Sequence, residues 1–181
     1  MMKTCVFITG TNAVGKSTLT RAIIAHYGGV DQIVNDVTYC VEGGVCLAGK
    51  YREGSLYGGV DGFPTKRLAD VVEEGLRHAN TIFCEGSFMN SFGLNLTNAM
   101  FKAERYLVVN LFSDCKTITD RLIGRSGITD RNYDFIFRKQ KESMMSARKW
   151  QSIGVNVLQF NTAEVSIEEQ VSATLKAIGK L

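Results

Sequence analysis

The sequence has few of the features that divide a chain or attach it to a membrane. It contains a single proline, Pro64, and neither internal repeats nor low-complexity segments, so nothing in it marks an extended linker. Hydrophobic residues make up 45% of the 181 residues, which is enough for one well-buried core. The first apolar run ends at Gly10 and is too short for a signal peptide or a membrane span. We therefore expect one domain over residues 1–181 and no membrane partner.

Paired cysteines and a strong charge of either sign are also missing. The five cysteines lie far apart without a C-x-x-C pair, and three fall in apolar runs, where cysteine behaves as a small hydrophobic side chain. This pattern argues against a disulfide framework or a zinc site and favours a reduced protein of the cytoplasm. The net charge of +3 permits an anionic substrate without requiring one.

Short apolar runs alternate along the chain with segments of helical periodicity. Strands are expected at 4–9, 32–36, 81–86, 106–112 and 155–160, with a small hairpin over 38–51 that turns at Gly43-Gly44. Helices are expected at 16–26, after an N-cap at Thr65, after Asp114, over 132–152, and after a capping box of Ser166 and Glu169. This alternation predicts an α/β fold of three layers, in which helices flank both faces of a mostly parallel sheet.

The first expected strand leads directly into a glycine-rich turn with a lysine and two hydroxyl groups. Residues 10–17 read GTNAVGKS and fit the pattern G-x-x-x-x-G-K-[ST], between a strand and a helix as phosphate binding requires. The glycines let consecutive backbone N–H groups point inward, and the helix N-terminus adds its positive end. Lys16 would reach the terminal phosphates of ATP, and Ser17 would hold a Mg²⁺ ion. The residues expected to bind ATP here are Gly10, Thr11, Asn12, Ala13, Val14, Gly15, Lys16, Ser17 and Thr18.

Three classes of nucleotide enzyme share this turn: GTPase switches, ATP-driven motors and kinases. No N-K-x-D sequence, which reads guanine in GTPases, occurs in the chain, and a motor usually needs a longer chain to convert hydrolysis into motion. A kinase needs acidic groups that orient the acceptor hydroxyl and the metal, and arginines that balance charge in the transition state. The sequence contains both, so it predicts an ATP-dependent phosphotransferase. A nucleotide-binding regulator that transfers little phosphate is the alternative from another class.

Three acidic residues are expected near one edge of the sheet. Glu85 ends the strand TIFCEG, so its carboxylate should emerge at the carboxyl edge, where ligands bind in open α/β folds. There it would hold magnesium together with Ser17 or act as the base. Asp36 ends the second expected strand, and Asp61 lies between glycines in GGVDGF; either could orient the acceptor hydroxyl or be an ordinary turn residue. The sequence leaves the identity of the base open.

Two arginines lie one helical turn apart, at Arg121 and Arg125, ahead of a glycine-containing loop. A pair at this spacing suits a short helical lid, here at about 121–135, that closes over ATP and excludes water. We expect both guanidinium groups to bind ATP and to stabilise the transferring phosphoryl group. A solvated basic helix end would give the same pattern without any ligand.

Taken together, these residues make the chain resemble the P-loop kinases of the nucleoside monophosphate (thymidylate) kinase type over nearly its full length. The resemblance implies a P-loop NTPase fold with a five-stranded parallel sheet, in which the strand ending at Glu85 neighbours the phosphate-loop strand. The order of LAGKY, GGVDGFPT, a helix and IFCEG is similar to bacteriophage 5-hydroxymethyluracil DNA kinases. That similarity implies phosphorylation of the hydroxymethyl group of a modified base in DNA, a step toward hypermodified thymidines, in the host cytoplasm. No D-R-[YFH] follows the third strand, where EGSF stands instead, which argues against simple thymidylate phosphorylation.

A DNA acceptor would require aromatic and cationic side chains near the site. The reacting base must come from a single strand or be flipped into a pocket, where an aromatic side chain can stack on it. The aromatic residues near the expected pocket, most of which also suit a core, are Tyr51, Tyr57, Phe63, Phe88 and Phe92. One side of the long helix carries Arg138, Lys141, Arg148 and Lys149, which would face either DNA phosphates or solvent. A free deoxynucleoside monophosphate is therefore kept as the second acceptor.

Overall fold

The computed structural model describes residues 2–40, 44–52, 58–90, 94–126 and 133–179, along which strands and helices alternate. The strands are β1 (Thr4–Gly10), β2 (Gln32–Val34), β3 (Val37–Cys40), β4 (Val45–Ala48), β5 (Thr81–Glu85), β6 (Arg105–Phe112) and β7 (Asn156–Asn161). The helices are α1 (Lys16–His26), α2 (Leu68–His78), α3 (Leu94–Met100), α4 (Cys115–Ser126), α5 (Tyr133–Ser152) and α6 (Ile167–Ala177), with 3₁₀ turns η2 (Thr65–Arg67) and η3 (Ser87–Asn90). Within these described ranges, no helix is both long and apolar enough to span a bilayer.

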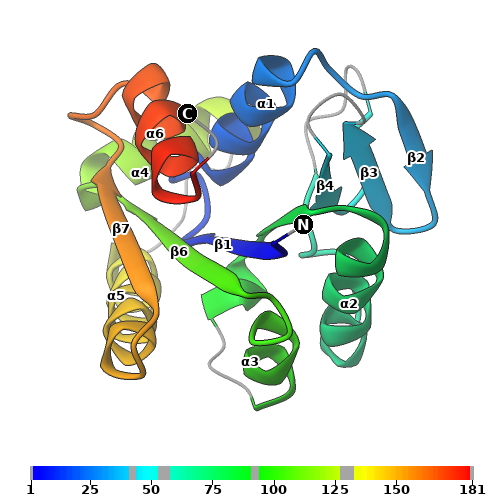
Figure 1. Ribbon diagram of the computed structural model, residues 1–181. Helices are drawn as coiled ribbons and strands as arrows, with labels where there is room; N and C mark the ends of the chain where they lie inside the picture. The colour runs from blue at the N-terminus through cyan, green and yellow to red at the C-terminus, as the bar shows by residue number, and fades with distance from the viewer. Residues whose placement is uncertain (1, 41–43, 53–57, 91–93, 127–132, 180–181) are drawn as a thin grey trace.

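The seven strands form one sheet in the order β2-β3-β4-β5-β1-β6-β7 (Figure 1). Five of them, β4, β5, β1, β6 and β7, run parallel, and Ile8 of β1 lies opposite Glu85 of β5. The expected contact between the phosphate-loop strand and the strand ending at Glu85 is confirmed. The expected count of five strands is wrong, because β3 pairs antiparallel with β4 and β2 pairs antiparallel with β3. The hairpin therefore extends the sheet instead of standing outside it.

Helices cover both faces of this sheet and give the expected three layers (Figure 1). β1 is buried along its whole length, and its alternate residues point to opposite faces. Val6 and Ile8 pack with α1 and α6 in one core, whereas Cys5 and Phe7 pack with α2, α3 and α5 in the other. A central strand that is apolar on both faces is typical of a parallel sheet between two helical layers.

The sequence predicts an N-terminal cap for three helices, and the structure contains two of these caps. Asp114 Oδ1 accepts a hydrogen bond at 2.8 Å from the backbone N–H three residues later, at the start of α4. Ser166 and Glu169 form the expected capping box at the start of α6. Thr65 instead begins the turn η2, and α2 starts at Leu68 without a side-chain cap.

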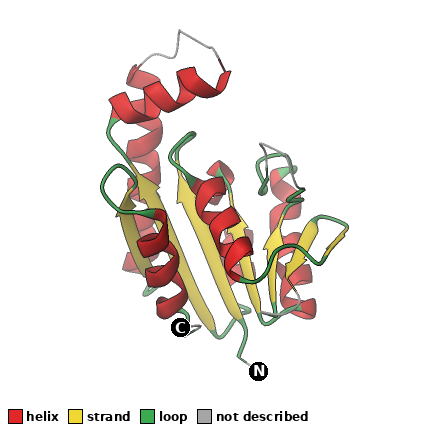
Figure 2. Cartoon of the chain, turned by 90° about the horizontal axis from the view of Figure 1, so that it is seen from above, coloured by secondary structure: helices red, strands yellow, loops and turns green. Residues whose placement is uncertain are grey.

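The parallel strands all point to one edge of the sheet (Figure 2). The turn after β1, the end of β5 and the turn η3 lie at this edge. Helix α4 packs there as well, because Ile118 and Leu122 share a small apolar cluster with Ala13 of the turn and Ile136 of α5. This edge therefore gathers the segments that carry the candidate ligand-binding residues.

Candidate active site

The turn from Gly10 to Gly15 wraps the backbone around the start of α1. Gly10 and Gly15 have φ angles of 140° and 102°, and Ala13 has a φ angle of 58°. A Cβ at Gly10 would lie 2.6 Å from the Leu111 carbonyl oxygen of β6, so this close approach requires glycine. The turn brings backbone N–H groups together with the positive end of α1, which is the arrangement that binds phosphate.

The Lys16 side chain lies within this turn and is only 7% exposed. Its Nζ donates hydrogen bonds to the Gly10 and Thr11 carbonyl oxygens, at 3.2 and 2.9 Å. Asn90 of η3 holds the same turn from another side: the Gly10 N–H donates to Asn90 Oδ1 at 3.2 Å, and Asn90 Nδ2 donates to the Gly10 carbonyl oxygen at 3.3 Å. No pattern in the sequence indicated this role for Asn90, because it depends on how η3 packs against β1.

Glu85 and Ser17 meet at the end of β5. The Ser17 hydroxyl donates to Glu85 Oε1 at 2.8 Å, and Glu85 is only 2% exposed. Burial raises the pKa of the Glu85 carboxyl, whereas the nearby Lys16 ammonium and the Ser17 hydrogen bond lower it. The Ser17 hydroxyl and the Glu85 carboxylate thus lie together beside a lysine.

These two oxygens fit one kind of metal better than others. In the part of the chain that the structure describes, no three His, Cys, Asp or Glu side chains gather closely enough to hold a metal ion. Mg²⁺ usually keeps several waters and takes only one or two protein oxygens plus phosphate oxygens of the substrate, so Ser17 and Glu85 suit it. They do not suit a structural zinc ion, which takes four protein ligands.

The glycine-rich segment GGVDG folds against Glu85. The Val60 N–H donates to the Glu85 carbonyl oxygen at 2.9 Å, and a Cβ at Gly59 would lie 2.7 Å from Glu85 Oε1. Asp61 comes next, and its Oδ1 accepts a hydrogen bond from the Ser87 N–H at 2.6 Å. The charge of Asp61 raises the pKa of Glu85, although less than burial does. The structure therefore brings Asp61 and Glu85 to the same site.

Asp36 lies apart from these two acids. It stands in the turn between β2 and β3, and it forms ion pairs with Arg67 Nη2 at 2.8 Å and Lys50 Nζ at 3.8 Å. Because β4 separates β3 from β5, Asp36 is two strand spacings, or roughly 10 Å, from the end of β5. Its carboxylate is already bound by cations, which makes Asp61 the better placed of the two aspartates to meet an acceptor.

Arg121 joins α4 to the loop after β7. Its Nη1 and Nη2 donate to the Thr162 hydroxyl and carbonyl oxygens, at 2.9 and 3.0 Å. A cavity of about 410 Å³ adjoins this contact and is lined by Arg121, by Gly15 and Thr18 of the turn and α1, and by the loop 162–167. The structure thus places Arg121 beside the start of α1, in a cavity large enough for a nucleobase.

The middle of the expected lid lies outside the described residues. Helix α4 ends at Ser126, α5 begins at Tyr133, and the segment 127–132 between them is not described. Arg125 belongs to α4, but its side chain also lies outside the described part of the structure. The role of region 121–135 as a lid stays a prediction.

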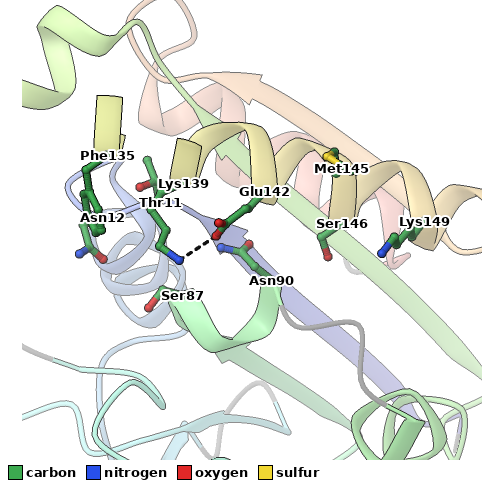
Figure 3. Close-up of a pocket in the computed structure, with 10 residues that line it drawn as sticks. All are labelled: Thr11, Asn12, Ser87, Asn90, Phe135, Lys139, Glu142, Met145, Ser146 and Lys149. Atoms are coloured by element: carbon green, nitrogen blue, oxygen red, sulfur yellow. Dashed lines mark hydrogen bonds and ion pairs between the residues drawn. The ribbon is translucent and has the colours of Figure 1, made fainter. Parts of the chain in front are cut away.

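A larger cavity of about 530 Å³ lies between the turn, η3 and α5 (Figure 3). We call it the α5 groove. Thr11 and Asn12 of the turn and η3 form one side of it, and residues of α5 between Phe135 and Lys149 form the other. Because Thr11 and Asn12 line it, a ligand in the groove would lie next to the phosphate-binding turn.

One aromatic residue at this groove was not among those that the sequence suggested. Tyr51 is 2% exposed and has no face free to stack on a base, and Phe63 packs against a core. Outside the described residues or side chains lie Tyr57, Phe88 and Phe92. Phe135 lines the groove at 39% exposure. Only the packing of α5 beside the turn reveals it, because its spacing in the sequence looks like that of any surface residue on a helix.

The sequence matches no family model and no curated protein, but the fold is similar to solved structures. YorR from Bacillus subtilis, in complex with phosphorylated GDP, is 14% identical with a TM-score of 0.64, over 97% of this chain and 95% of its own. A sugar kinase from Janibacter sp. HTCC2649 is 12% identical with a TM-score of 0.57, over 98% and 95%. Deoxyadenosine kinase from M. mycoides with bound dCTP is 15% identical with a TM-score of 0.52, over 98% and 100%. The chain therefore has an α/β fold of the P-loop kinase type.

Proposed function

We propose that the chain is an ATP- and magnesium-dependent phosphotransferase. One observation carries this proposal: Lys16, Ser17 and Glu85 converge at the phosphate-binding turn, with Ser17 hydrogen-bonded to Glu85 at 2.8 Å. A buried carboxylate costs folding free energy, so its place beside a phosphate site is best explained by a role with the metal or the acceptor. The fold shared with kinases supports the same function.

The donor phosphates would be held by residues 10–18. Backbone N–H groups of the turn and the N-terminus of α1 would bind the β- and γ-phosphates, and Lys16 would balance the charge on both. Ser17 and Glu85 would hold Mg²⁺, which would supply positive charge next to the γ-phosphoryl group. Arg121, together with Arg125, would bind the transferring group from α4 and help to exclude water.

The acceptor hydroxyl would attack from the α5 groove. A bond forms between the acceptor oxygen and the γ-phosphorus, the bond from that phosphorus to the β–γ bridging oxygen breaks, and ADP leaves. The hydroxyl proton passes to a carboxylate. Asp61 is the base that we favour, because it is exposed beside Glu85, whereas Asp36 is paired with Arg67.

The acceptor that we propose is the hydroxymethyl group of 5-hydroxymethyluracil in DNA. The similarity of GGVDGFPT and IFCEG to kinases of that substrate supports it, and Phe135 in the α5 groove offers a ring on which a pyrimidine can stack. A free deoxynucleoside monophosphate is the second candidate, because a groove of about 530 Å³ also suits a single nucleotide.

The deciding experiment supplies labelled ATP and Mg²⁺ to the purified protein with three kinds of acceptor. These are a single-stranded oligonucleotide containing 5-hydroxymethyluracil, the matching free nucleotide, and the ordinary deoxynucleoside monophosphates. Label in the oligonucleotide supports the DNA acceptor, and label on free monophosphates alone contradicts it. ATP binding without transfer to any acceptor would favour a nucleotide-binding regulator instead.

Lys16→Ala should abolish this transfer. Removing the ammonium leaves the charge that develops on the phosphates without its nearest cation, so turnover should fall by about a thousandfold. Lys176→Ala removes an exposed lysine from α6 and serves as the matched control, with turnover close to that of the wild type. Circular dichroism should show that both variants fold. Wild-type turnover in Lys16→Ala would contradict phosphoryl transfer at this turn.

A further inference from the structure

Helix α5 carries a surplus of positive charge. Within Tyr133–Ser152, five cationic residues stand against two acidic ones, a surplus that equals the net charge of +3 for the whole chain. The rest of the sequence is therefore neutral on balance. Lys139 is paired with Glu142 at 2.7 Å. No carboxylate among the described residues pairs with the other lysines of the helix or with Arg148.

Two cavities adjoin α5 over nearly the same turns of the helix, on different sides of it. The α5 groove is lined from Phe135 to Lys149, which is about 21 Å along the helix axis. A second cavity, of about 300 Å³, is lined by Phe137, Gln140, Lys141, Met144, Met145 and Arg148. Met145 lines both cavities, so they adjoin at that residue. A single nucleotide would occupy only part of this length.

Exposed apolar side chains alternate with the cations on this surface. Phe137 is 63% exposed and Met145 is 49% exposed, while the Arg138 guanidinium lies 5.6 Å from the centre of the Phe135 ring. Rings interleaved with cations bind single-stranded nucleic acid, because bases stack on the rings while phosphates meet the charges. Ser146 also lines the groove, and its buried hydroxyl has no hydrogen-bond partner within the described structure (Figure 3).

We propose that the surface formed by the α5 groove and the second cavity binds a single-stranded polynucleotide. The reacting nucleotide would lie in the α5 groove, and the adjoining nucleotides would lie in the second cavity. Phosphates would meet Lys141, Arg148 and Lys149, and a base would stack on Phe137. This inference rests on the proposed function only in taking the strand as the acceptor, since binding requires no phosphoryl transfer. A free mononucleotide would leave the second cavity and its cations without a role.

Fluorescence anisotropy with a labelled pyrimidine strand, in the absence of ATP, tests this surface. A strand about 12 nucleotides long covers the groove and the second cavity, and the matching mononucleotide serves as a competitor. Arg148→Gln/Lys149→Gln removes two cations from α5, and Arg77→Gln/Lys176→Gln removes two exposed cations from α2 and α6 as the matched control.

We expect the α5 double variant to bind the strand about tenfold more weakly than the wild type at low salt. The slope of log Kd against log salt concentration should fall by about 1.4, because each phosphate that a cation neutralises on a single strand adds about 0.7 to the slope. The control double variant should keep the wild-type affinity and slope. Equal losses of affinity in the two double variants, or no strand binding by the wild type at low salt, would overturn the proposal.

Phe137→Ala tests base stacking without a change of charge. Removing one stacking platform should weaken strand binding by about 5- to 100-fold. Phe101→Ala removes an aromatic side chain that is 41% exposed and lies outside α5, and it should leave strand binding unchanged. Thermal unfolding of each variant checks that the fold is intact. Unchanged binding by Phe137→Ala would count against a nucleic acid on this surface.

Three further results bear on this proposal, and the last two separate it from the proposed function. If polyglutamate displaces the strand as well as unlabelled polythymidylate does, the surface attracts any polyanion and the proposal is wrong. If strand binding requires α5 but no phosphate is transferred to a 5-hydroxymethyluracil strand, the binding surface is supported and the DNA acceptor is contradicted. If free nucleotides are phosphorylated while the α5 and control variants bind the strand equally, the phosphotransferase activity is supported and the binding surface on α5 is contradicted.

Discussion

Among single residues, three glycines decide how closely the backbone approaches the acids of the site. A Cβ at Gly49 would lie 2.4 Å from the Gly59 carbonyl oxygen, and one at Gly59 would lie 2.5 Å from the Glu85 carbonyl oxygen. A Cβ at Gly86 would lie 2.5 Å from Asp61 Oδ1. These close contacts run from the end of β4 to both carboxylates. The glycine-rich segment therefore positions the two acids relative to the turn.

Gly59→Ala should lower both stability and turnover. At its φ of 81°, an L side chain is strained, and the new Cβ would collide with Glu85, so the unfolding free energy should fall by about 1–3 kcal/mol. A shift of Glu85 away from Ser17 should lower turnover by about a hundredfold. Gly62→Ala is the matched control, because nothing lies within 4 Å of its Cβ position. Identical urea unfolding and kinase rates for the two variants would contradict a positioning role.

Among helices and loops, α4 is fixed to two parts of the donor side at once. Ile118 and Leu122 pack against Ala13 of the turn, and Arg121 donates two hydrogen bonds to Thr162 of the loop after β7. That loop also leads to the capping box that opens α6. The cavity beside Arg121 therefore has walls from three separate segments, and contacts of α4 reach two of them.

Arg121→Gln should weaken ATP binding with little effect on the fold. A hydrogen bond from a charged donor is worth about 1.5–3 kcal/mol, which corresponds to a loss of affinity of about 10- to 100-fold. Lys116→Gln is the matched control, because it removes from the same helix a cation that pairs with the exposed Asp120 nearby. Titration calorimetry with ATP measures both variants. The prediction is wrong if they lose the same affinity.

For the molecule as a whole, β1 connects the phosphate-binding turn to both cores. Trp150 of α5 is fully buried and meets the Phe7 ring of β1 edge-on, with centroids 5.8 Å apart. It is the only tryptophan in the chain, so its emission reports on the packing of α5 against the central strand. A ligand that binds at the turn would stabilise the folded state that Trp150 reports on.

Saturating ATP with Mg²⁺ should therefore raise the midpoint of thermal unfolding. A ligand at about 100 times its Kd adds about 2.7 kcal/mol to the stability, which corresponds to about 5–10 °C for a chain of this length. The emission of Trp150 during heating measures the midpoint. Removing Mg²⁺ with a chelator should reduce the shift, and Lys16→Ala should lose most of it. A full shift in Lys16→Ala would place the bound ATP away from the turn.

Much of the fold could be predicted from the sequence because its signals are local. The helix that begins at Lys16, the capping box at Ser166, and the strand that ends at Glu85 each follow from a few consecutive residues. The addition of β2 and β3 to the sheet could not be predicted in this way. It depends on pairing with the free edge of β4, which the sequence of the hairpin does not specify.

The candidate site, too, could be predicted from the sequence only where its signals are local. Residue types in a fixed spacing located the turn, but Asp36 and Asp61 looked equivalent until the structure showed that Arg67, from a distant segment, pairs with Asp36. Asn90 and Phe135 were missed because their roles depend on packing between elements far apart in the sequence. Tertiary contacts, unlike turns and caps, leave no pattern within a short window of residues.

The two hydrogen bonds from Lys16 to the carbonyl oxygens of its own turn have a consequence for binding entropy. A lysine side chain loses about 1.5–2 kcal/mol of rotamer freedom when it is fixed in one conformation. Because Gly10 and Thr11 already hold the ammonium, this entropy is lost when the chain folds. An incoming triphosphate therefore meets a side chain that is already ordered, and its affinity depends mainly on whether phosphate oxygens accept from Nζ more favourably than the two carbonyls do.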